Sequence, residues 1–280
     1  MKILILPYLF MSVVYALLNA ETWTVKEVLF QIAGSIFLGK SAVYFILIIF
    51  QFYLLHIFCA RYLSQWSGKV VIPVAFVINA GYLAFFNFTD APSHAVGDYF
   101  WNVGYWMPFV GWLFYFVLGF YGGKNYEAIV AMLRSKWILI IPGIALAGML
   151  LMNKYFMISP DSKRVDMLLY ACSVIFSIMF IGIRFQRVPR FIMLISNYSF
   201  SIFLLNMFFF VLISYVEPPV FLNIATYSIS AFIITLVLCI GTTYVFNQFR
   251  FGKYFVGAVM PFKVAHTERY DEVTLRRGLK

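Results

Sequence analysis

Apolar residues along this 280-residue chain gather in long runs that short polar segments separate. A helix needs about 20 mostly apolar residues to cross a hydrocarbon core about 30 Å thick. Runs of about that length lie roughly at 3–20, 42–60, 70–88, 103–121, 137–153, 166–184, 197–216 and 221–247. They are apolar on every face, whereas the strands of a membrane β-barrel alternate. The pattern predicts an all-α, polytopic transmembrane helix bundle with about eight spans.

Composition excludes the main alternative, a water-soluble globule. Hydrophobic residues make up 63% of the chain, aromatic residues 21% and charged residues only 11%. This leaves too little polar surface to cover a soluble protein of this length.

The distribution of basic residues predicts the orientation. With a cytosolic N-terminus, sixteen of the twenty-one Lys and Arg fall in inner segments, and the rule that inner loops are positive then places both termini in the cytosol. The five outer cations are Lys26, Lys40, Lys154, Lys163 and Arg164. This topology and anionic lipid headgroups account for the net charge of +10 without a nucleic-acid partner. Alternatively, the first run is a cleaved signal peptide, which would leave seven spans and an outer N-terminus.

The chain reads as one membrane domain, 1–262, followed by a charged cytosolic tail, 263–280. Between the first two runs, Thr24 and Glu27 have the spacing of a helix capping box. An apolar stripe at helical spacing overlaps it and comprises Val25, Leu29, Ile32 and Ile36. We therefore expect a helix that lies on the outer surface or covers the bundle as a lid.

The three cysteines predict neither a metal site nor a disulfide. Cys59, Cys172 and Cys239 all fall inside apolar runs, where a thiol behaves as a small hydrophobe. Their spacing matches no metal-binding motif.

Polar residues inside the predicted spans are the candidates for a buried site, because each is costly unless it faces protein or water. Ser199 and Asn206 are seven apart and share a helical face. The candidate substrate-binding residues are Gln51, Tyr53, Asn79, Arg184, Ser199 and Asn206. The alternative is that these groups bond between helices, at about 0.6 kcal/mol per contact. Arg184 also suits a boundary residue whose charge reaches the cytosolic surface.

Two histidines are candidate catalytic bases. His56 is the only imidazole inside a predicted span. His94, in an outer loop, has Asp90 and Asp98 four residues to either side, so a carboxylate could orient its imidazole. Pro92 and Gly97 argue against one continuous helix through all three residues, which leaves a solvated loop as the alternative.

Carboxylates are absent from the interior of every predicted span. A proton-driven transporter is expected to carry an intramembrane carboxylate relay, so this absence disfavours ion-coupled transport.

Four segments resemble the bacterial integral-membrane acyltransferases of the acyltransferase 3 type, including the subgroup related to the intercellular adhesin biosynthesis protein. They are ILPYLFMSVVYAL at 5–17, GKSAVYFILIIFQFYLL at 39–55, GWLFYFVLGFYGGKN at 111–125 and ISNYSFSIFLLN at 195–206. The resemblance covers most of the chain, and it implies a location in the bacterial plasma membrane.

The resemblance also implies an activity. An acyl group from a cytosolic thioester donor such as acetyl-CoA would be transferred to a hydroxyl of a cell-surface or lipid-linked saccharide. A general base would activate that hydroxyl, and helix-borne polar groups would hold the thioester or the oxyanion.

The sequence departs from the family pattern at its start. The segment around Pro7 resembles the family's third helix, so we expect the family's first two helices, with the arginine and the catalytic histidine of the opening helix, to have no counterpart in this sequence. The histidine that is frequent near the seventh span is replaced by Asn206. A carrier or flippase for a lipid-linked glycan, and a catalytically inactive relative, are therefore the alternatives to an acyltransferase.

Overall fold

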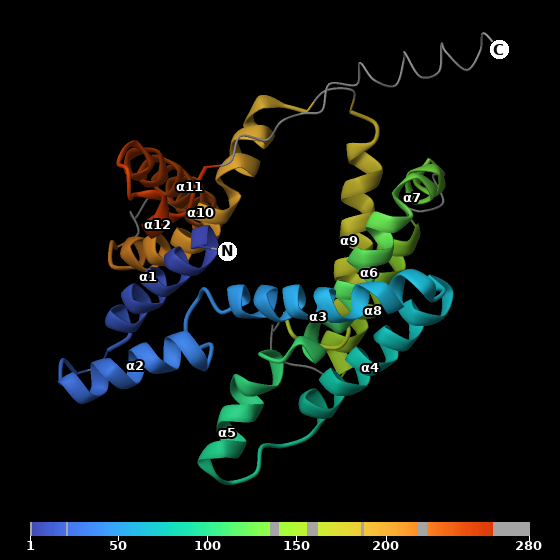
Figure 1. Cartoon of the computed structure of the whole chain (residues 1–280), viewed down its shortest axis with the longest axis horizontal. Helices are drawn as coiled ribbons and strands as arrows, with labels where there is room; N and C mark the ends of the chain where they lie inside the picture. The colour runs from blue at the N-terminus through green and yellow to red at the C-terminus, as the bar shows by residue number, and fades with distance from the viewer. Residues whose placement is uncertain are drawn as a thin grey trace. The chain divides into compact units, whose positions relative to one another are not determined.

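The computed structural model describes residues 2–20, 22–134, 140–155, 162–185, 188–217 and 223–259. Within these ranges every regular element is a helix, so the predicted all-α class is confirmed. The chain divides into two compact units, a larger unit, Tyr8–Arg187, and a smaller unit, Met1–Pro7 with Val188–Lys280 (Figure 1). Helix α1 (Lys2–Leu18) has residues in both units. The predicted tail, 263–280, lies outside the described residues.

The helices that follow α1 divide between the two units in chain order. The larger unit holds α2 (Val25–Phe37), α3 (Phe45–Gln65), α4 (Gly68–Phe88), α5 (Ala95–Asn102), the 3-10 turns η1 (Gly104–Trp106) and η2 (Phe109–Trp112), α6 (Leu113–Lys124), α7 (Tyr126–Leu133), α8 (Ile140–Tyr155) and α9 (Met167–Gly182). The smaller unit holds α10 (Arg190–Ser214), α11 (Ile224–Gln248) and α12 (Lys253–Val256).

Four helices in the described part of the chain are long and apolar enough to cross a membrane, judged by length and composition. They are α3, α4, α10 and α11, and two shorter apolar helices, Ile3–Leu18 and α9, accompany them. The number of spans, eight, and the cytosolic termini stay predictions.

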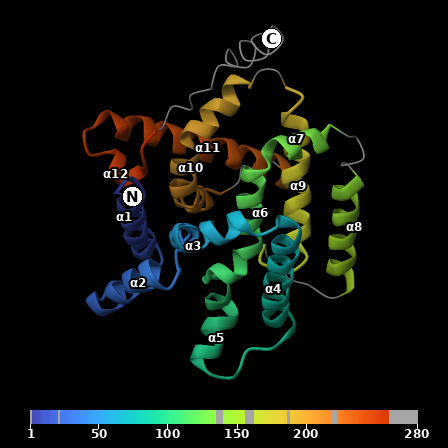
Figure 2. The ribbon, with the colours of Figure 1, turned by 45° about the vertical axis from the view of Figure 1, so that its right-hand side comes forward.

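The core of the larger unit lies where α4 packs along α6 and α8 packs along α9 (Figure 2). One cluster of buried side chains comprises Leu83, Tyr105, Trp106, Phe114, Leu168 and Cys172. A second cluster comprises Leu63, Ala75, Val117 and Tyr121. The Tyr121 hydroxyl donates to the carbonyl of Leu63 at 2.9 Å, which joins α6 to the end of α3. Apolar burial thus aligns α6 with both α3 and α4.

The run 103–121, predicted as one helix, is interrupted, and this prediction is wrong. Two 3-10 turns occupy its first half, and the α-helix begins only at Leu113. Pro108 has φ −67° and ψ 146°, an extended conformation that ends the first turn. Gly104 is needed beside the break because a Cβ there would lie 2.8 Å from the ring of Phe100. Average apolarity did not reveal this interruption, because the broken segment is as apolar as a span.

Side chains of α3 and α4 bind the interrupted backbone. Gln51 donates through Nε2 to the carbonyl of Met107 at 2.9 Å and accepts the N–H of Phe109 through Oε1 at 2.8 Å, so it brackets Pro108. The amide of Asn79, fully buried, donates to the carbonyl of Gly111 at 3.0 Å and accepts the N–H of Phe114 at 3.1 Å. Both amides therefore satisfy backbone groups that the interruption leaves without helical partners.

The predicted helix after the first run is confirmed as α2. Its N-cap, Thr24, accepts the backbone N–H of Glu27 through its side chain at 3.4 Å, as the capping box requires. Tyr8 of α1 donates its hydroxyl to the carbonyl of Ile36 at 2.6 Å, which connects α2 to α1. The position of α2 as an outer surface helix or lid stays a prediction.

The loop that carries His94 forms a short helix, α5. His94 is its N-cap, and its Nδ1 accepts the N–H of Gly97 at 2.9 Å. The helix begins after Asp90 and Pro92, so it does not align His94 with both neighbouring carboxylates. Tyr99 donates its hydroxyl to the carbonyl of Leu38 at 3.1 Å, and partial burial raises the pKa of this hydroxyl, so it stays a donor at neutral pH.

In the smaller unit, α10 and α11 pack along one another and α12 folds back onto both. Asn247 donates to the carbonyls of Thr243 and Gly257, at 2.9 and 3.0 Å. Gly257 has φ 89°, and a Cβ there would lie 2.7 Å from the ring of Phe200. The return of the chain onto α10 therefore requires glycine at this position.

We expect Asn79→Leu to lower the free energy of unfolding by about 3 kcal/mol, because it leaves a buried carbonyl and a buried N–H unsatisfied. Unfolding of the purified chain in detergent measures the loss. Asn102→Leu is the matched control, since the Asn102 side chain is exposed and donates within α5, to the carbonyl of Asp98. Equal losses in the two variants would contradict the role of Asn79.

Candidate functional site

A groove of about 770 Å³ lies between α3 and α6 in the larger unit. Most of its surface is apolar, and its two ionisable nitrogen groups, on His56 and Lys124, lie far apart along it. Its lining comprises Phe52, His56, Ser64, Tyr115, Phe116, Gly119, Phe120, Gly123 and Lys124. We call this cavity the α3–α6 groove.

His56 lies in the middle of α3 and Lys124 lies at the last turn of α6. The His56 ring is 6.1 Å from the ring of Phe120 across the groove, and its side chain is exposed. Lys124 donates to the carbonyl of Ser64 at 2.7 Å. Ser64 follows His56 by eight residues, about 12 Å along the helix. The groove therefore has an imidazole at mid-helix and an ammonium at the end predicted to face the cytosol.

Two glycines keep the α6 wall of the groove open. A Cβ on Gly119 or Gly123 would have no other heavy atom within 4 Å. The two residues are one helical turn apart, so they leave a continuous gap on one face of α6. This gap gives a narrow chain-like ligand room beside His56.

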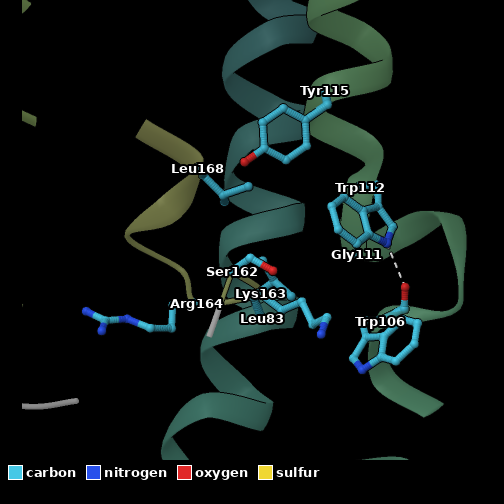
Figure 3. Close-up of a pocket in the computed structure, with 9 residues that line it drawn as sticks. All are labelled: Leu83, Trp106, Gly111, Trp112, Tyr115, Ser162, Lys163, Arg164 and Leu168. Atoms are coloured by element: carbon cyan, nitrogen blue, oxygen red, sulfur yellow. Dashed lines mark hydrogen bonds between the residues drawn. The ribbon is translucent and has the colours of Figure 1, made fainter. Parts of the chain in front are cut away.

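A second, much smaller cavity of about 10 Å³ lies below the interrupted segment and has room for about one water molecule. Figure 3 shows the Lys163 amine pointing toward Trp106 while the Arg164 side chain extends away. The Lys163 Nζ lies 4.6 Å from the centre of the Trp106 ring. The indole N–H of Trp112 donates to the carbonyl of Trp106 at 2.6 Å, which holds the aromatic wall in place. We call this the Lys163 cavity.

Tyr115 borders both the α3–α6 groove and the Lys163 cavity. Its hydroxyl donates to the carbonyl of Met167 at 3.3 Å, so the ring is attached to α9 at its far end. The tyrosine is therefore a shared wall that separates the two spaces.

Arg164, predicted as an outer-loop cation, is a buried residue with an ion pair. Only 3% of its side chain is exposed, and its Nη2 lies 2.7 Å from Oδ2 of Asp166. It also donates to Asn153 of α8 at 3.0 Å. Sequence reasoning missed this group because it treated Arg164 only as an outer cation and did not pair it with Asp166, the first residue of the run 166–184. The Arg-x-Asp spacing at the start of that run was the available signal.

The remaining predicted residues are dispersed. Gln51 and Asn79 bind backbone, and Tyr53 is exposed outside the groove lining. Arg184 lines a separate recess, and His94 caps α5. Of the two predicted catalytic bases, His56 alone lines the α3–α6 groove.

In the smaller unit, the two predicted residues Ser199 and Asn206 are both exposed on α10. Asn206 lines a cleft of about 390 Å³ between α10 and α11, whereas Ser199 is not part of its wall. The hydroxyl of Thr235, in the same cleft, is buried without a hydrogen-bond partner. The two predicted residues thus do not form one site.

The described ranges contain no group of side chains that could bind a metal ion. No three His, Cys, Asp or Glu side chains there gather closely enough to hold a metal ion. Cys172 and Cys239 are buried in apolar surroundings, as expected for structural thiols.

The long apolar helices are those of a helical membrane protein. The imidazole of His56 in the α3–α6 groove is its candidate acid–base group. A family model described as "Acyltransferase domain" matches residues 1–245. The chain belongs to this acyltransferase 3 family, as the resemblance in its four segments predicted.

Individual relatives agree with this assignment. A protein of Bacillus subtilis (strain 168), "Putative membrane-bound acyltransferase YfiQ", is 36% identical, and the alignment covers 92% of this chain and 73% of the relative. A "Probable poly-beta-1,6-N-acetyl-D-glucosamine export protein" of Staphylococcus aureus (strain Mu50 / ATCC 700699) is 27% identical, over 94% of this chain and 75% of the relative. No solved structure matches the chain significantly.

We expect Asp166→Asn to cost about 3 kcal/mol of stability, because it removes the carboxylate charge that lies 2.7 Å from the buried Arg164 guanidinium. The double variant Arg164→Met/Asp166→Leu removes both charges and should recover most of that loss. Unfolding measurements on the three chains test this. If the single variant were as stable as the double variant, the ion pair would have no such role.

Proposed function

We propose that this chain is a membrane-bound O-acyltransferase of the bacterial plasma membrane. It transfers an acetyl-like acyl group from a cytosolic thioester, such as acetyl-CoA, to a hydroxyl of a cell-surface or lipid-linked saccharide. The observation that carries the proposal is the His56 imidazole in the wall of the α3–α6 groove. Family membership supports the reaction class, and the saccharide in the name of the staphylococcal relative supports the acceptor class.

The chemistry assigns His56 the role of general base. The imidazole takes the proton of the acceptor hydroxyl as the hydroxyl oxygen attacks the thioester carbonyl carbon. The C–O bond forms, the C–S bond breaks, and the imidazolium returns the proton to the leaving thiolate. The products are the acylated saccharide and the free thiol.

The groove suits a donor that enters from the end at Lys124. Its mostly apolar walls suit an acyl chain, and the Lys124 ammonium at the mouth would attract an anionic donor. The gap beside Gly119 and Gly123 accepts a narrow chain that reaches His56.

Export of a lipid-linked glycan is the second candidate function, because the staphylococcal relatives carry the word export in their names. Export requires a path wide enough for saccharide rings. In the larger unit, Tyr115 separates the α3–α6 groove from a cavity of about 10 Å³. This wall favours group transfer over passage of a whole glycan. Movement of labelled glycan without an acylated product would support export instead.

We expect His56→Gln to reduce acyl transfer at least about 100-fold, because the general base is lost. The assay incubates inverted membrane vesicles with acetyl-CoA carrying a labelled acetyl group and measures label in saccharide. His94→Asn is the control, since asparagine also caps a helix and preserves α5. Normal transfer by His56→Gln, or loss only in His94→Asn, would contradict the role of His56.

Gly119→Leu should raise the KM for acetyl-CoA about tenfold or more, a loss of about 1.4 kcal/mol of binding, because the new side chain fills the groove. Folding should persist, since the site is open and leucine favours a helix more than glycine does. Gly81→Leu is the matched control, because Gly81 of α4 also faces open space but lies outside the groove lining. Kinetics and melting temperatures of both variants separate a blocked groove from a damaged fold.

A further inference from the structure

Helix α7 follows α6 and packs against α9 (Figures 1 and 2). A recess of about 260 Å³ lies at this contact. Its lining is Val130 and Arg134 on one side and Ile183 and Arg184 on the other. Two arginines, which follow the ends of α7 and α9, therefore line one small space.

The recess has positive charge without a matching anion among its walls. Both arginine side chains are exposed, and no carboxylate of the described residues forms an ion pair with either. The acidic residue of α7 is Glu127, seven positions before Arg134 and about 10 Å away along the helix. An anion entering the recess would meet both cations directly.

A backbone contact and a ring contact hold the Arg184 side chain in place. Arg184 donates through Nη1 to the carbonyl of Phe180 at 2.6 Å, and its guanidinium lies 3.3 Å from the centre of the Phe180 ring. This leaves other N–H groups of Arg184 available. Arg134 follows Leu133, which is fully buried and anchors the end of α7. Preorganised arginines lose less conformational entropy when they bind an anion.

We propose that Arg134 and Arg184 form a phosphate-binding site. A phosphate offers several strong acceptor oxygens, and paired guanidinium groups match that geometry. The phosphates of a coenzyme A donor and the headgroup phosphate of an anionic phospholipid share this chemistry. Binding of a coenzyme A donor rests on the proposed acyl transfer, whereas binding of a phospholipid headgroup does not.

The position of the recess fits both sources. It lies at the predicted cytosolic side, where α9 ends and where α7 continues from the Lys124 mouth of the groove. A coenzyme A whose phosphates sit in the recess would have its thioester arm beside the groove. A phospholipid there would have its headgroup at the membrane surface.

The test uses the full chain in phosphatidylcholine nanodiscs, with the variant Arg134→Gln/Arg184→Gln. One arm measures binding of coenzyme A and of pantetheine, which lacks the phosphates. The other arm replaces part of the phosphatidylcholine with phosphatidylglycerol and measures retained lipid by native mass spectrometry. The matched control is Arg61→Gln/Lys69→Gln, which removes two exposed cations from the same predicted side and outside the recess.

We expect the recess variant to weaken binding of one phosphate probe at least tenfold, with pantetheine unaffected and the control pair within about twofold of the parent. Weakening of coenzyme A alone identifies the donor, and weakening of phosphatidylglycerol alone identifies a lipid. Equal losses in the two double variants, or unchanged binding of both phosphate probes, would overturn the site. A parent chain that retains phosphatidylglycerol but transfers no acetyl group would refute the proposed function and leave the phosphate site intact.

Discussion

Backbone hydrogen bonding in an apolar surrounding is the constraint on which the larger unit depends. An N–H or carbonyl without a partner costs several kcal/mol in hydrocarbon, so an interrupted helix persists only where other groups satisfy it. Gln51 and Asn79 supply those partners on both sides of the turn that ends at Trp112. Because α6 starts at Leu113, the hydrogen bonds of Gln51 and Asn79 also fix the position of α6 relative to α3 and α4. The α3–α6 groove is therefore a consequence of how the break is satisfied.

The polar groups of the α3–α6 groove lie at different positions along it. The imidazole of His56 is set against aromatic and glycine residues at mid-helix, whereas Lys124 remains at the end. The recess of Arg134 and Arg184 lies beyond that end, along the next helix of the chain. At the other side, Tyr115 closes the groove against Lys163 and the aromatic wall of the small cavity. Under the proposed function, a thioester with an anionic head enters at the Lys124 end and reaches His56 along the groove.

Several elements could be predicted from local pattern. The runs 42–60, 70–88 and 221–247 correspond to α3, α4 and α11, and the capping box of Thr24 corresponds to the start of α2. Local pattern suffices there because apolar helices and caps depend on residues within one or two turns. Local pattern failed at 103–121, because the prediction of one helix followed the average apolarity of the run and gave too little weight to Pro108 and the glycines.

The sequence by itself determined that the chain forms apolar helices, that its cations are unevenly shared between the loops, and that His56 is the one imidazole in a predicted span. Only the tertiary structure decided which polar side chains already have hydrogen-bond or ion-pair partners within the protein. Gln51 and Asn79 looked as available as His56, but their partners are 58 and 35 residues further along the chain, at Phe109 and Phe114. Arg164 looked solvated, but Asp166 and Asn153 enclose it. Hydrogen bonds between distant segments depend on how helices pack, and that packing cannot be read from the spacing of residues within one helix.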